Sequence, residues 1–408
     1  MSLDQRSDRW MLPDGIEEML PERAACIQAL RRTLLDQFRA WGYDYVIPPM
    51  VEFVESLLTG TGRDSDLDLR TSKLTDQLTG KLMGVRADIT PQVARIDAHS
   101  MQCEGVNRLC YSGHVMHARP RSPLASRIPI QAGVEIFGEP SVAADIEVTS
   151  LMADSLQRAG IHDLHIDLAQ VNVFRSLVHA AKLNQNDETV LRELVRNRRV
   201  SELHDWLSGS SLSPALTRSF SALPEMIGGI EVLDRAAAVF DGVIDFASIQ
   251  GNLEACYNTL NKRFEGISIS FDLSELRGYS YHTGIVFGAY TGSAGHSIAS
   301  GGRYDKVGES FGRARPATGF VINVSALAGA LDDKDYLSAK TAESVFVPAS
   351  VAKIENIWPR ISELRQANRR VVVGLTGQDK AEPHQRCTHA MAADGSIATL
   401  QTDIKRSM

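Results

Sequence analysis

Cysteines are few in this chain of 408 residues, and their spacing suits neither a metal site nor a disulfide framework. The chain has no CxxC pair and no cysteine and histidine at zinc-finger spacing. Isolated cysteines of this kind are typical of free thiols in a reducing compartment. The sequence therefore predicts no structural metal and a cytoplasmic location. The five cysteines are Cys26, Cys103, Cys110, Cys256 and Cys387.

Long apolar runs and an export signal are also missing. The N-terminus carries charged residues such as Asp4, Arg6 and Asp8 where a signal peptide needs an apolar run. The longest uncharged apolar stretch, residues 316–331, is shorter than the ~20 residues that cross a bilayer. We therefore expect a soluble protein that does not bind a membrane.

Charge of one sign is not concentrated anywhere in the chain. The sequence has 43 Lys and Arg against 50 Asp and Glu, for a formal net charge of −7. An acidic chain without a basic block offers no electrostatic footprint for nucleic acid. With 43% hydrophobic and 23% charged residues it can bury a sizeable core, so composition excludes a disordered or fibrous protein. The length suggests two or three domains at roughly 100–200 residues each.

Common catalytic and metal-binding motifs are absent as well. The sequence contains no P-loop, GxGxxG, GxSxG or HExxH motif. Two HxxH pairs occur, His114 with His117 and His162 with His165. The first lies in a strand-like segment, where residues i and i+3 face opposite sides. Surface histidines with satisfied hydrogen bonds explain both pairs better than metal ligation does.

The apolar pattern predicts an α+β fold. A helix is expected at residues 22–40, followed by a strand at 43–47 that Pro48 and Pro49 end. Residues 70–139 contain short β-favouring segments, and a helix at 145–159 should cover them. Strand signals return at 267–273 and 285–290, and we expect both β-rich blocks to form one antiparallel sheet flanked by helices.

Two further regions differ from this pattern. Residues 168–264 show long helical periodicity, for example at 186–206, and are expected to form a helical insertion. The tail has strand signals at 345–347 and 371–375 around a helix at 354–367, which predicts a small α/β domain. The expected domains are residues 1–331, which include the insertion, and residues 332–408.

Two polar stretches are hard to explain by packing alone. In residues 86–90, Arg86, Asp88 and Thr90 alternate with apolar residues, so a strand would present all three on one face, although a solvated strand face explains this equally well. Gln131 and Glu135 would likewise share a strand face, around a glycine that leaves room above the sheet. Polar side chains around a vacant position suggest the floor of a pocket.

A third stretch, residues 277–284, places an arginine, two tyrosines and a histidine between glycines. This composition suits a small polar ligand better than a core. Asp88 and Glu135 would suit the ammonium of an amino acid, and Arg277, near Gln131, its carboxylate. The alternative is a buried salt-bridge network without any ligand.

Together these stretches resemble the catalytic domain of histidyl-tRNA synthetase, a class II aminoacyl-tRNA synthetase, over residues 10–331. Residues 41–52 are similar to its first class motif, the dimerisation element, and residues 131–138 (QAGVEIFG) to the end of its second. Residues 277–287 (RGYSYHTGIVF) resemble its histidine-recognition loop, and residues 301–305 (GGRYD) follow. The resemblance implies the class II fold and a histidine-binding set of Asp88, Thr90, Gln131, Glu135, Arg277, Tyr281 and His282.

The sequence departs from the synthetase where that enzyme holds ATP. The second-motif arginine and the following glutamate correspond to Met116 and Ala118, and the third-motif arginine corresponds to Ala326. Methionine and alanine cannot make the charge-assisted hydrogen bonds of guanidinium to phosphate. Each lost transition-state donor costs roughly 10²–10³ in rate. We therefore expect degenerate ATP-site positions, no catalytic residues and no cofactor.

The tail points to the same conclusion, because residues 332–408 have 11 Lys and Arg against 10 Asp and Glu, which makes tRNA binding unlikely. A histidine pocket without ATP chemistry resembles the synthetase-like regulatory subunits of ATP phosphoribosyltransferase. That resemblance implies activation of a short-form catalytic subunit in a hetero-octamer, feedback inhibition by L-histidine, and self-association as a dimer. Two alternatives stay open: a true histidyl-tRNA synthetase, and a synthetase-like histidine sensor for another partner.

Overall fold

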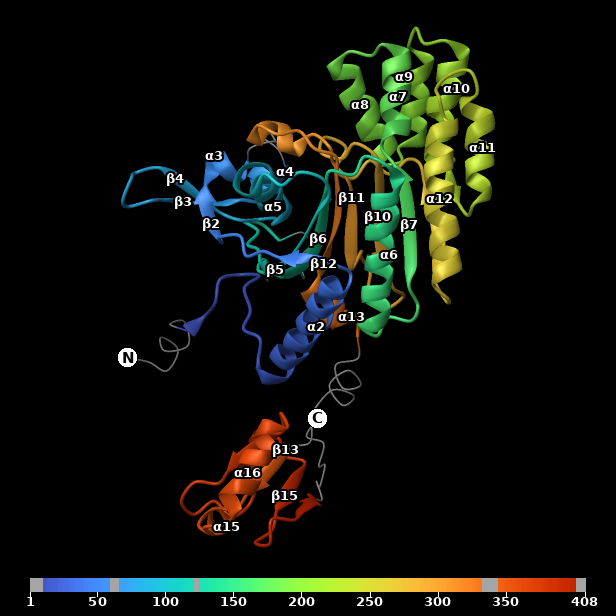
Figure 1. Cartoon of the computed structure of the whole chain (residues 1–408). Helices are drawn as coiled ribbons and strands as arrows, with labels where there is room; N and C mark the ends of the chain where they lie inside the picture. Colours follow the sequence, from blue (N-terminus) through green and yellow to red (C-terminus); the bar gives the residue numbers. More distant parts are fainter. Residues whose placement is uncertain (1–9, 59–65, 121–124, 332–343, 401–408) are drawn as a thin grey trace, which may run out of the picture. The chain divides into compact units, whose positions relative to one another are not determined.

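A nine-stranded sheet lies at the centre of the computed structural model (Figure 1). Neighbouring strands are antiparallel except for two parallel pairs, β1 with β5 and β7 with β9. The sheet joins strands from both β-rich blocks, as expected, but residues 72–75 and 82–85 of the first block belong to a separate small sheet, so the two blocks do not form one sheet alone. In spatial order its strands are β1 (Asp44–Tyr45), β5 (Asn107–His114), β6 (Ile130–Phe137), β12 (Ala317–Asn323), β11 (Ala299–Arg303), β10 (Ile285–Tyr290), β7 (His165–Gln170), β9 (Ser268–Asp272) and β8 (Ile227–Gly228).

Three helices cover one face of this sheet: α2 (Pro21–Ala40), α6 (Val142–Arg158) and α13 (Val324–Ala330). The ring of Phe38 on α2 meets the ring of Phe320 on β12 edge to face, with centroids 5.8 Å apart. Helix α6 begins three residues before the expected start, because the Ser141 hydroxyl accepts a hydrogen bond from the Ala143 amide and caps the helix. The expected strand at 43–47 is shorter than predicted.

The opposite face, which we call the site face, carries Gln131, Gly133 and Glu135 of β6. It is covered by α5 (Thr90–Arg95), the π-helical turn η2 (Ile96–Met101) and the 3₁₀ turn η4 (Val307–Phe311), which enclose a core that includes Ile89, Val93 and Phe137. A separate three-stranded sheet belongs to this part of the chain. Its strands, in spatial order, are β2 (Val51–Phe53), β4 (Leu82–Val85) and β3 (Ser72–Thr75). The short helices α3 (Val54–Leu57) and α4 (Asp66–Arg70) lie between these strands in the sequence.

The strand predicted for residues 86–90 is wrong. Strand β4 ends at Val85, and α5 begins at Thr90 with Pro91 in its first turn. A proline there suits a helix start, because its missing N–H would have no partner and its φ is already helical. Asp88 and Thr90 therefore reach the site from a loop and a helix start, and not from alternate positions of a strand.

The segment that connects β7 to β9 in the sequence forms a helical block, which lies at one end of the sheet in Figure 1. The expected long helix at 186–206 is two helices, because the chain turns at Arg198, whose φ of 52° is left-handed. The helices are α7 (Asn172–Ala181), α8 (Gln185–Arg196), α9 (Val200–Ser208), α10 (Pro214–Ala222), α11 (Glu231–Phe240) and α12 (Ala247–Arg263), with a 3₁₀ turn η3 (Leu223–Glu225) after α10.

The C-terminal unit has its own four-stranded sheet and its own apolar core, which includes Val345, Ile361 and Met391. Its order is β14 (Arg370–Val373), β13 (Ser344–Val347), β15 (His389–Met391) and β16 (Ile397–Thr399), and it carries α15 (Ala349–Ala352), α16 (Ile357–Gln366) and the 3₁₀ turn η5 (Pro383–Gln385). The two strands and the helix expected from the sequence correspond to β13, β14 and α16. The hairpin β15–β16 was not predicted.

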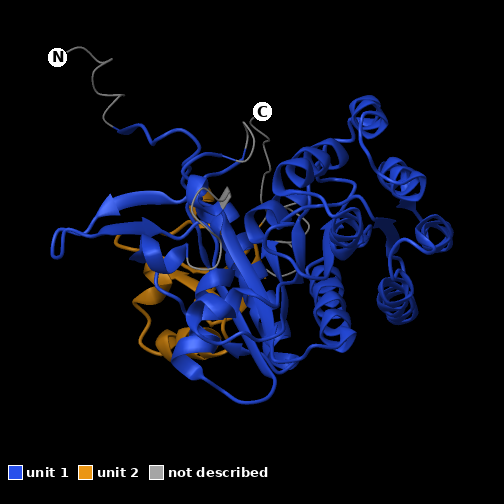
Figure 2. Ribbon diagram, turned by 90° about the horizontal axis from the view of Figure 1, so that it is seen from above, with its two compact units in different colours: residues 1–333 blue, residues 334–408 orange. Residues whose placement is uncertain are grey.

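The structure describes residues 10–58, 66–120, 125–331 and 344–400. Contacts divide the chain into two units, Met1–Asp333 and Lys334–Met408, which Figure 2 colours separately. Within the described residues, no helix combines the length and the apolar character that a membrane span requires.

Candidate histidine site

Glu135 is the most deeply buried acid of the site face, with 1% of its surface exposed. The strand register places it between Leu109 on β5 and Gly319 on β12. A Cβ atom on Gly319 would lie 1.8 Å from the carboxyl oxygen Oε2 of Glu135. Glycine is therefore required at position 319 to leave room for this carboxyl group.

Two tyrosines donate hydrogen bonds to Glu135. The Tyr111 hydroxyl lies 3.1 Å from Oε1, and the Tyr304 hydroxyl lies 2.5 Å from Oε2. The Thr90 hydroxyl lies 3.1 Å from that of Tyr111 and extends the network to α5. Burial raises the pKa of Glu135 to about 8, although these hydroxyl groups favour the anion; nearby Asp88 raises the pKa further. The carboxyl group is therefore mostly protonated at neutral pH.

Tyr281 and His282 join the network from the loop between β9 and β10. The Tyr281 ring stacks on Tyr304 with centroids 5.1 Å apart, and its buried hydroxyl has no hydrogen-bond partner among the described residues. His282 packs close to Gly278, where a Cβ atom would lie 2.6 Å from the imidazole. Burial lowers the pKa of His282 to about 4, so this imidazole is neutral at physiological pH.

Gln131 provides a second unpartnered polar atom. Its side chain is buried four residues from Glu135 on the same strand face, and Oε1 has no hydrogen-bond partner within the described ranges. Buried polar groups are normally hydrogen-bonded, so an orphaned amide oxygen and an orphaned hydroxyl on this side of the sheet indicate missing polar partners. Asp88 and Thr90 are partly exposed beside this buried floor, and Asp88 accepts a hydrogen bond from the Ile89 amide at 2.7 Å.

Arg277 is placed differently from the rest of the predicted set. Its guanidinium donates to Glu275 and to the Tyr290 hydroxyl, each at 3.0 Å, and half of the side chain is exposed. Tyr290 lies on β10, three strands from β6 in the sheet order, or about 14 Å at the usual strand spacing. The structure thus gives Arg277 no hydrogen bond to the group around Glu135. Contacts through Tyr111 and Tyr304 bring Thr90, Tyr281 and His282 to this group, and Asp88 is near enough to raise the pKa of Glu135. Gln131 shares the strand face with Glu135, four residues away.

The three positions predicted to form a degenerate ATP site carry no charge, and the backbone amide of each is hydrogen-bonded. The Met116 amide donates to the Arg86 carbonyl at 2.9 Å, and the Ala118 amide donates to the Arg70 carbonyl at 2.8 Å. The Ala326 amide donates to the Asn323 side chain at 3.1 Å, in the first turn of α13.

The sequence analysis missed Tyr111 and Tyr304, the two donors to Glu135. Tyr111 stands opposite Gly133 in the β5–β6 register, and its hydroxyl fills the space where a Cβ atom of residue 133 would be. Tyr304 belongs to the GGRYD segment. Gly133 could have indicated such a residue, because a glycine in a strand leaves space that a large side chain of the neighbouring strand can fill.

Among the described residues, no group of three or more His, Cys, Asp or Glu side chains could hold a metal ion. His165 lies 2.7 Å from the Ser268 hydroxyl through Nδ1 and 2.8 Å from Asp167 through Nε2. It is a hydrogen-bonded histidine on the sheet, as the sequence analysis interpreted it.

Comparisons with known proteins show which family the chain resembles. The family model described as "Histidyl-tRNA synthetase" matches residues 15–327. The ATP phosphoribosyltransferase regulatory subunit of Saccharophagus degradans is 47% identical, with 96% of this chain and 98% of that protein covered. The protein of the same name from Teredinibacter turnerae is 49% identical, with 93% and 95% covered.

Solved structures show the same fold. An ATP phosphoribosyltransferase regulatory subunit/histidyl-tRNA synthetase from Bacillus halodurans superimposes with a TM-score of 0.78 at 24% identity, covering 91% of this chain and 94% of that one. Histidyl-tRNA synthetase from Nostoc sp. gives a TM-score of 0.75 at 18% identity, with 96% of each chain covered. The expected class II synthetase-like fold is thereby confirmed.

Proposed function

Because this chain belongs to the family of ATP phosphoribosyltransferase regulatory subunits, we propose that it binds L-histidine on the site face and conveys feedback inhibition to a short-form catalytic subunit, which it also activates. The partner carries the reaction of ATP with phosphoribosyl pyrophosphate, which gives phosphoribosyl-ATP and pyrophosphate. The observation that carries the histidine site is that two buried polar atoms on the side of Glu135, the Tyr281 hydroxyl and Oε1 of Gln131, have no hydrogen-bond partner among the described residues.

An amino-acid ligand suits these groups. Asp88 and Glu135 supply anionic charge for the ammonium, with Thr90 as a further hydrogen-bond acceptor. Tyr281 and Gln131 offer hydrogen bonds to an imidazole. The neutral ring of His282 packs on Tyr281 with centroids 5.2 Å apart and holds that tyrosine in place. The charged ligand would also favour the anionic form of Glu135, which burial disfavours in the free site.

Arg277 is our proposed partner for the histidine carboxylate. It belongs to the same loop as Tyr281, and its half-exposed guanidinium is paired with the partly exposed Glu275 side chain. An exposed pair of this kind is worth little, about 0–1 kcal/mol, so a carboxylate ligand can displace it. The proposal therefore requires that Arg277 breaks its ion pair with Glu275 and binds the carboxylate of histidine in its place.

Assembly is the second part of the proposal. Apolar side chains of the first-motif region are exposed, among them Tyr45 at 45%, Ile47 at 79% and Met50 at 44%. Exposed apolar patches of this kind mark interaction sites, which supports self-association of the chain as a dimer within a hetero-octamer in the cytoplasm. Histidine can inhibit such an assembly only if it binds one of its conformations more tightly than another.

The test is the rate of phosphoribosyl-ATP formation by a short-form catalytic subunit, with and without this chain and with added L-histidine. We expect stimulation that histidine suppresses. Replacing Glu135 by Gln should raise the histidine concentration for half-inhibition by about 10- to 100-fold, because a charge-assisted contact is worth roughly 1.5–3 kcal/mol. Glu193→Gln, an exposed glutamate on α8, is the matched control and should change it less than twofold.

Absence of stimulation, or equal histidine sensitivity in native chain and E135Q, would contradict the proposal. Calorimetric titration of histidine into the chain alone separates the two parts, because it measures the site without the partner.

The synthetase alternative makes the opposite prediction for ATP chemistry. With Met116 and Ala326 in place of two arginines, we expect histidine-dependent exchange of pyrophosphate into ATP to be at least about 10⁴-fold slower than in a histidyl-tRNA synthetase assayed in parallel. Robust exchange by the purified chain would show that it is a synthetase and not only a regulatory subunit.

A further inference from the structure

A separate pocket opens between the helical block and the histidine-recognition loop. Its volume is about 710 Å³, within the usual range of roughly 300–1,000 Å³ for small-molecule sites. Helix α7 lines it with Arg175 and His179, and Lys182 follows at the end of that helix. Helix α8 contributes Glu188 and Arg192, and the loop contributes Tyr279. None of these residues belongs to the group around Glu135.

The charge of this pocket is strongly unbalanced. Three permanent cations, Arg175, Lys182 and Arg192, face one carboxylate, Glu188. Glu188 accepts a hydrogen bond from the Tyr279 hydroxyl at 2.9 Å. Within the described ranges, none of the three cations is ion-paired with a carboxylate. The lining therefore keeps a net positive charge that an anion would neutralise.

Two arginines lie over one aromatic ring. The guanidinium carbon of Arg175 lies 4.8 Å from the centroid of Tyr279, and that of Arg192 lies 5.7 Å from it. Arg175 is held by neutral acceptors, because it donates to the carbonyls of Tyr279 and His282 at 2.9 and 3.1 Å and to the Asn172 side chain at 2.9 Å. These bonds leave the charge of Arg175 uncompensated, and a bound anion would reduce the repulsion between the two guanidinium groups.

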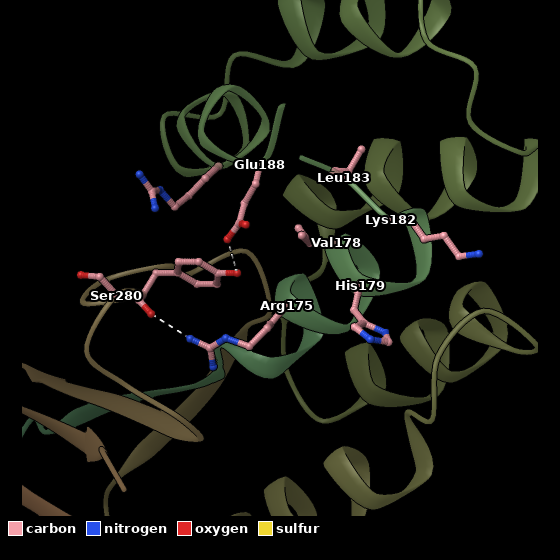
Figure 3. A pocket seen from close by; sticks show the side chains of 9 residues that line it. Arg175, Val178, His179, Lys182, Leu183, Glu188 and Ser280 are labelled. Carbon is pink, nitrogen blue, oxygen red and sulfur yellow. Dashed lines mark hydrogen bonds between the residues drawn. The ribbon is translucent and has the colours of Figure 1, made fainter. Parts of the chain in front are cut away.

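Figure 3 shows how the pocket is arranged. Glu188 and Arg175 point toward the recognition loop, where dashed lines mark their hydrogen bonds to Tyr279, and His179 and Lys182 lie farther along the chain. Arg192 follows Glu188 by one helical turn on α8. The two arginines thus supply positive charge beside the loop, and the exposed Lys182 adds a further charge.

We propose that this pocket binds a phosphate-bearing small molecule, with Arg192 and Arg175 as its principal donors. Guanidinium groups match the geometry of phosphate oxygens and bind them through paired hydrogen bonds. The site shares no residue with the group around Glu135. Tyr279 belongs to the recognition loop and Arg175 donates hydrogen bonds to it, so occupancy of this pocket bears directly on the segment that presents Tyr281.

The test is isothermal titration calorimetry of the full chain with inorganic pyrophosphate at low ionic strength. We expect saturable binding that Arg192→Gln weakens by about 10- to 100-fold, the loss expected for one charge-assisted donor pair. Arg196→Gln is the matched control, because Arg196 lies one turn further on α8, is 58% exposed and does not line the pocket. It should change the affinity less than twofold.

Three results would overturn the proposal: no saturable binding by the native chain, equal affinity in the native chain and R192Q, or equal losses in R192Q and R196Q. Circular dichroism checks that R192Q is folded. If it is not, Lys182→Gln at the exposed rim gives the same test, with an expected loss of about three- to tenfold from a single exposed charge. Equal affinity in K182Q and the native chain would then count against the site.

Discussion

When the pH is raised from about 5 to about 9, we expect the free energy of unfolding to fall in the native chain. The fall should be larger than in the Glu135→Gln variant by on the order of 3–5 kcal/mol. The cause is the buried Glu135 carboxyl group, whose pKa burial raises from 4.5 to about 8. Between these values the folded chain holds a proton that the unfolded chain has released. Stability therefore falls as the pH rises through this window, and the loss is complete above pH 8.

The substitution to glutamine isolates this one group. Other buried acids also titrate, among them Asp145, whose pKa burial raises, but they are present in both proteins and cancel in the difference. Chemical denaturation at several pH values, followed by circular dichroism, gives the two curves. Parallel curves would mean that Glu135 is ionised in the folded chain at neutral pH. E135Q should be the more stable protein at pH 9 and close to the native chain at pH 5.

The strand-based part of this site was predictable from sequence. Gln131 and Glu135 are two strand periods apart, and β6 places them on one face as expected. Their surroundings were not predictable by the same argument, because Tyr111 and Tyr304 come from strands whose register the sequence does not reveal. Tyr304 lies 169 residues from Glu135 along the chain.

One error near the site and one open prediction have different physical origins. Alternation at residues 86–90 suggested a strand, but Pro91 suits the first turn of a helix and α5 begins at Thr90. Arg277 was grouped with Glu135 by charge complementarity and by the resemblance of its loop, and its role in binding stays a prediction. In the structure it is paired with a nearer carboxylate, Glu275, two residues away. Local partners of this kind compete with any longer-range pairing that a sequence suggests.

The GGRYD segment, which the sequence analysis associated with the histidine loop, supports that loop through a buried ion pair. Arg303 binds Asp145 of α6 through Nε and Nη2, at 3.0 and 2.8 Å from Oδ2, and both side chains are less than a tenth exposed. The carbonyl of Arg303 accepts a hydrogen bond from the Thr283 amide at 2.7 Å. Arg303 thus connects α6, β11 and the loop that carries His282.

Replacing Asp145 by Asn should destabilise the larger unit by roughly 3–5 kcal/mol, the usual cost of leaving one partner of a buried ion pair uncompensated. Denaturant unfolding measures this loss. Glu202→Gln is the control: its pair with Arg199 on α9 is more than half exposed on both sides, and its loss should cost less than about 1 kcal/mol. Equal effects of the two substitutions would contradict the structural role of Arg303.

A double substitution distinguishes the cost of burying an unpaired charge from the cost of lost packing. Replacing Asp145 by Leu together with Arg303 by Met removes both charges, and we expect it to be less destabilising than D145N alone, because no unpaired charge stays buried.

The histidine affinity of the same double variant tests whether the ion pair affects the candidate site. If the pair holds the recognition loop through the Arg303 backbone, the double variant should keep its histidine affinity, since the carbonyl that accepts the Thr283 amide is still present. A large loss of affinity would instead mean that the Arg303 side chain itself positions the loop.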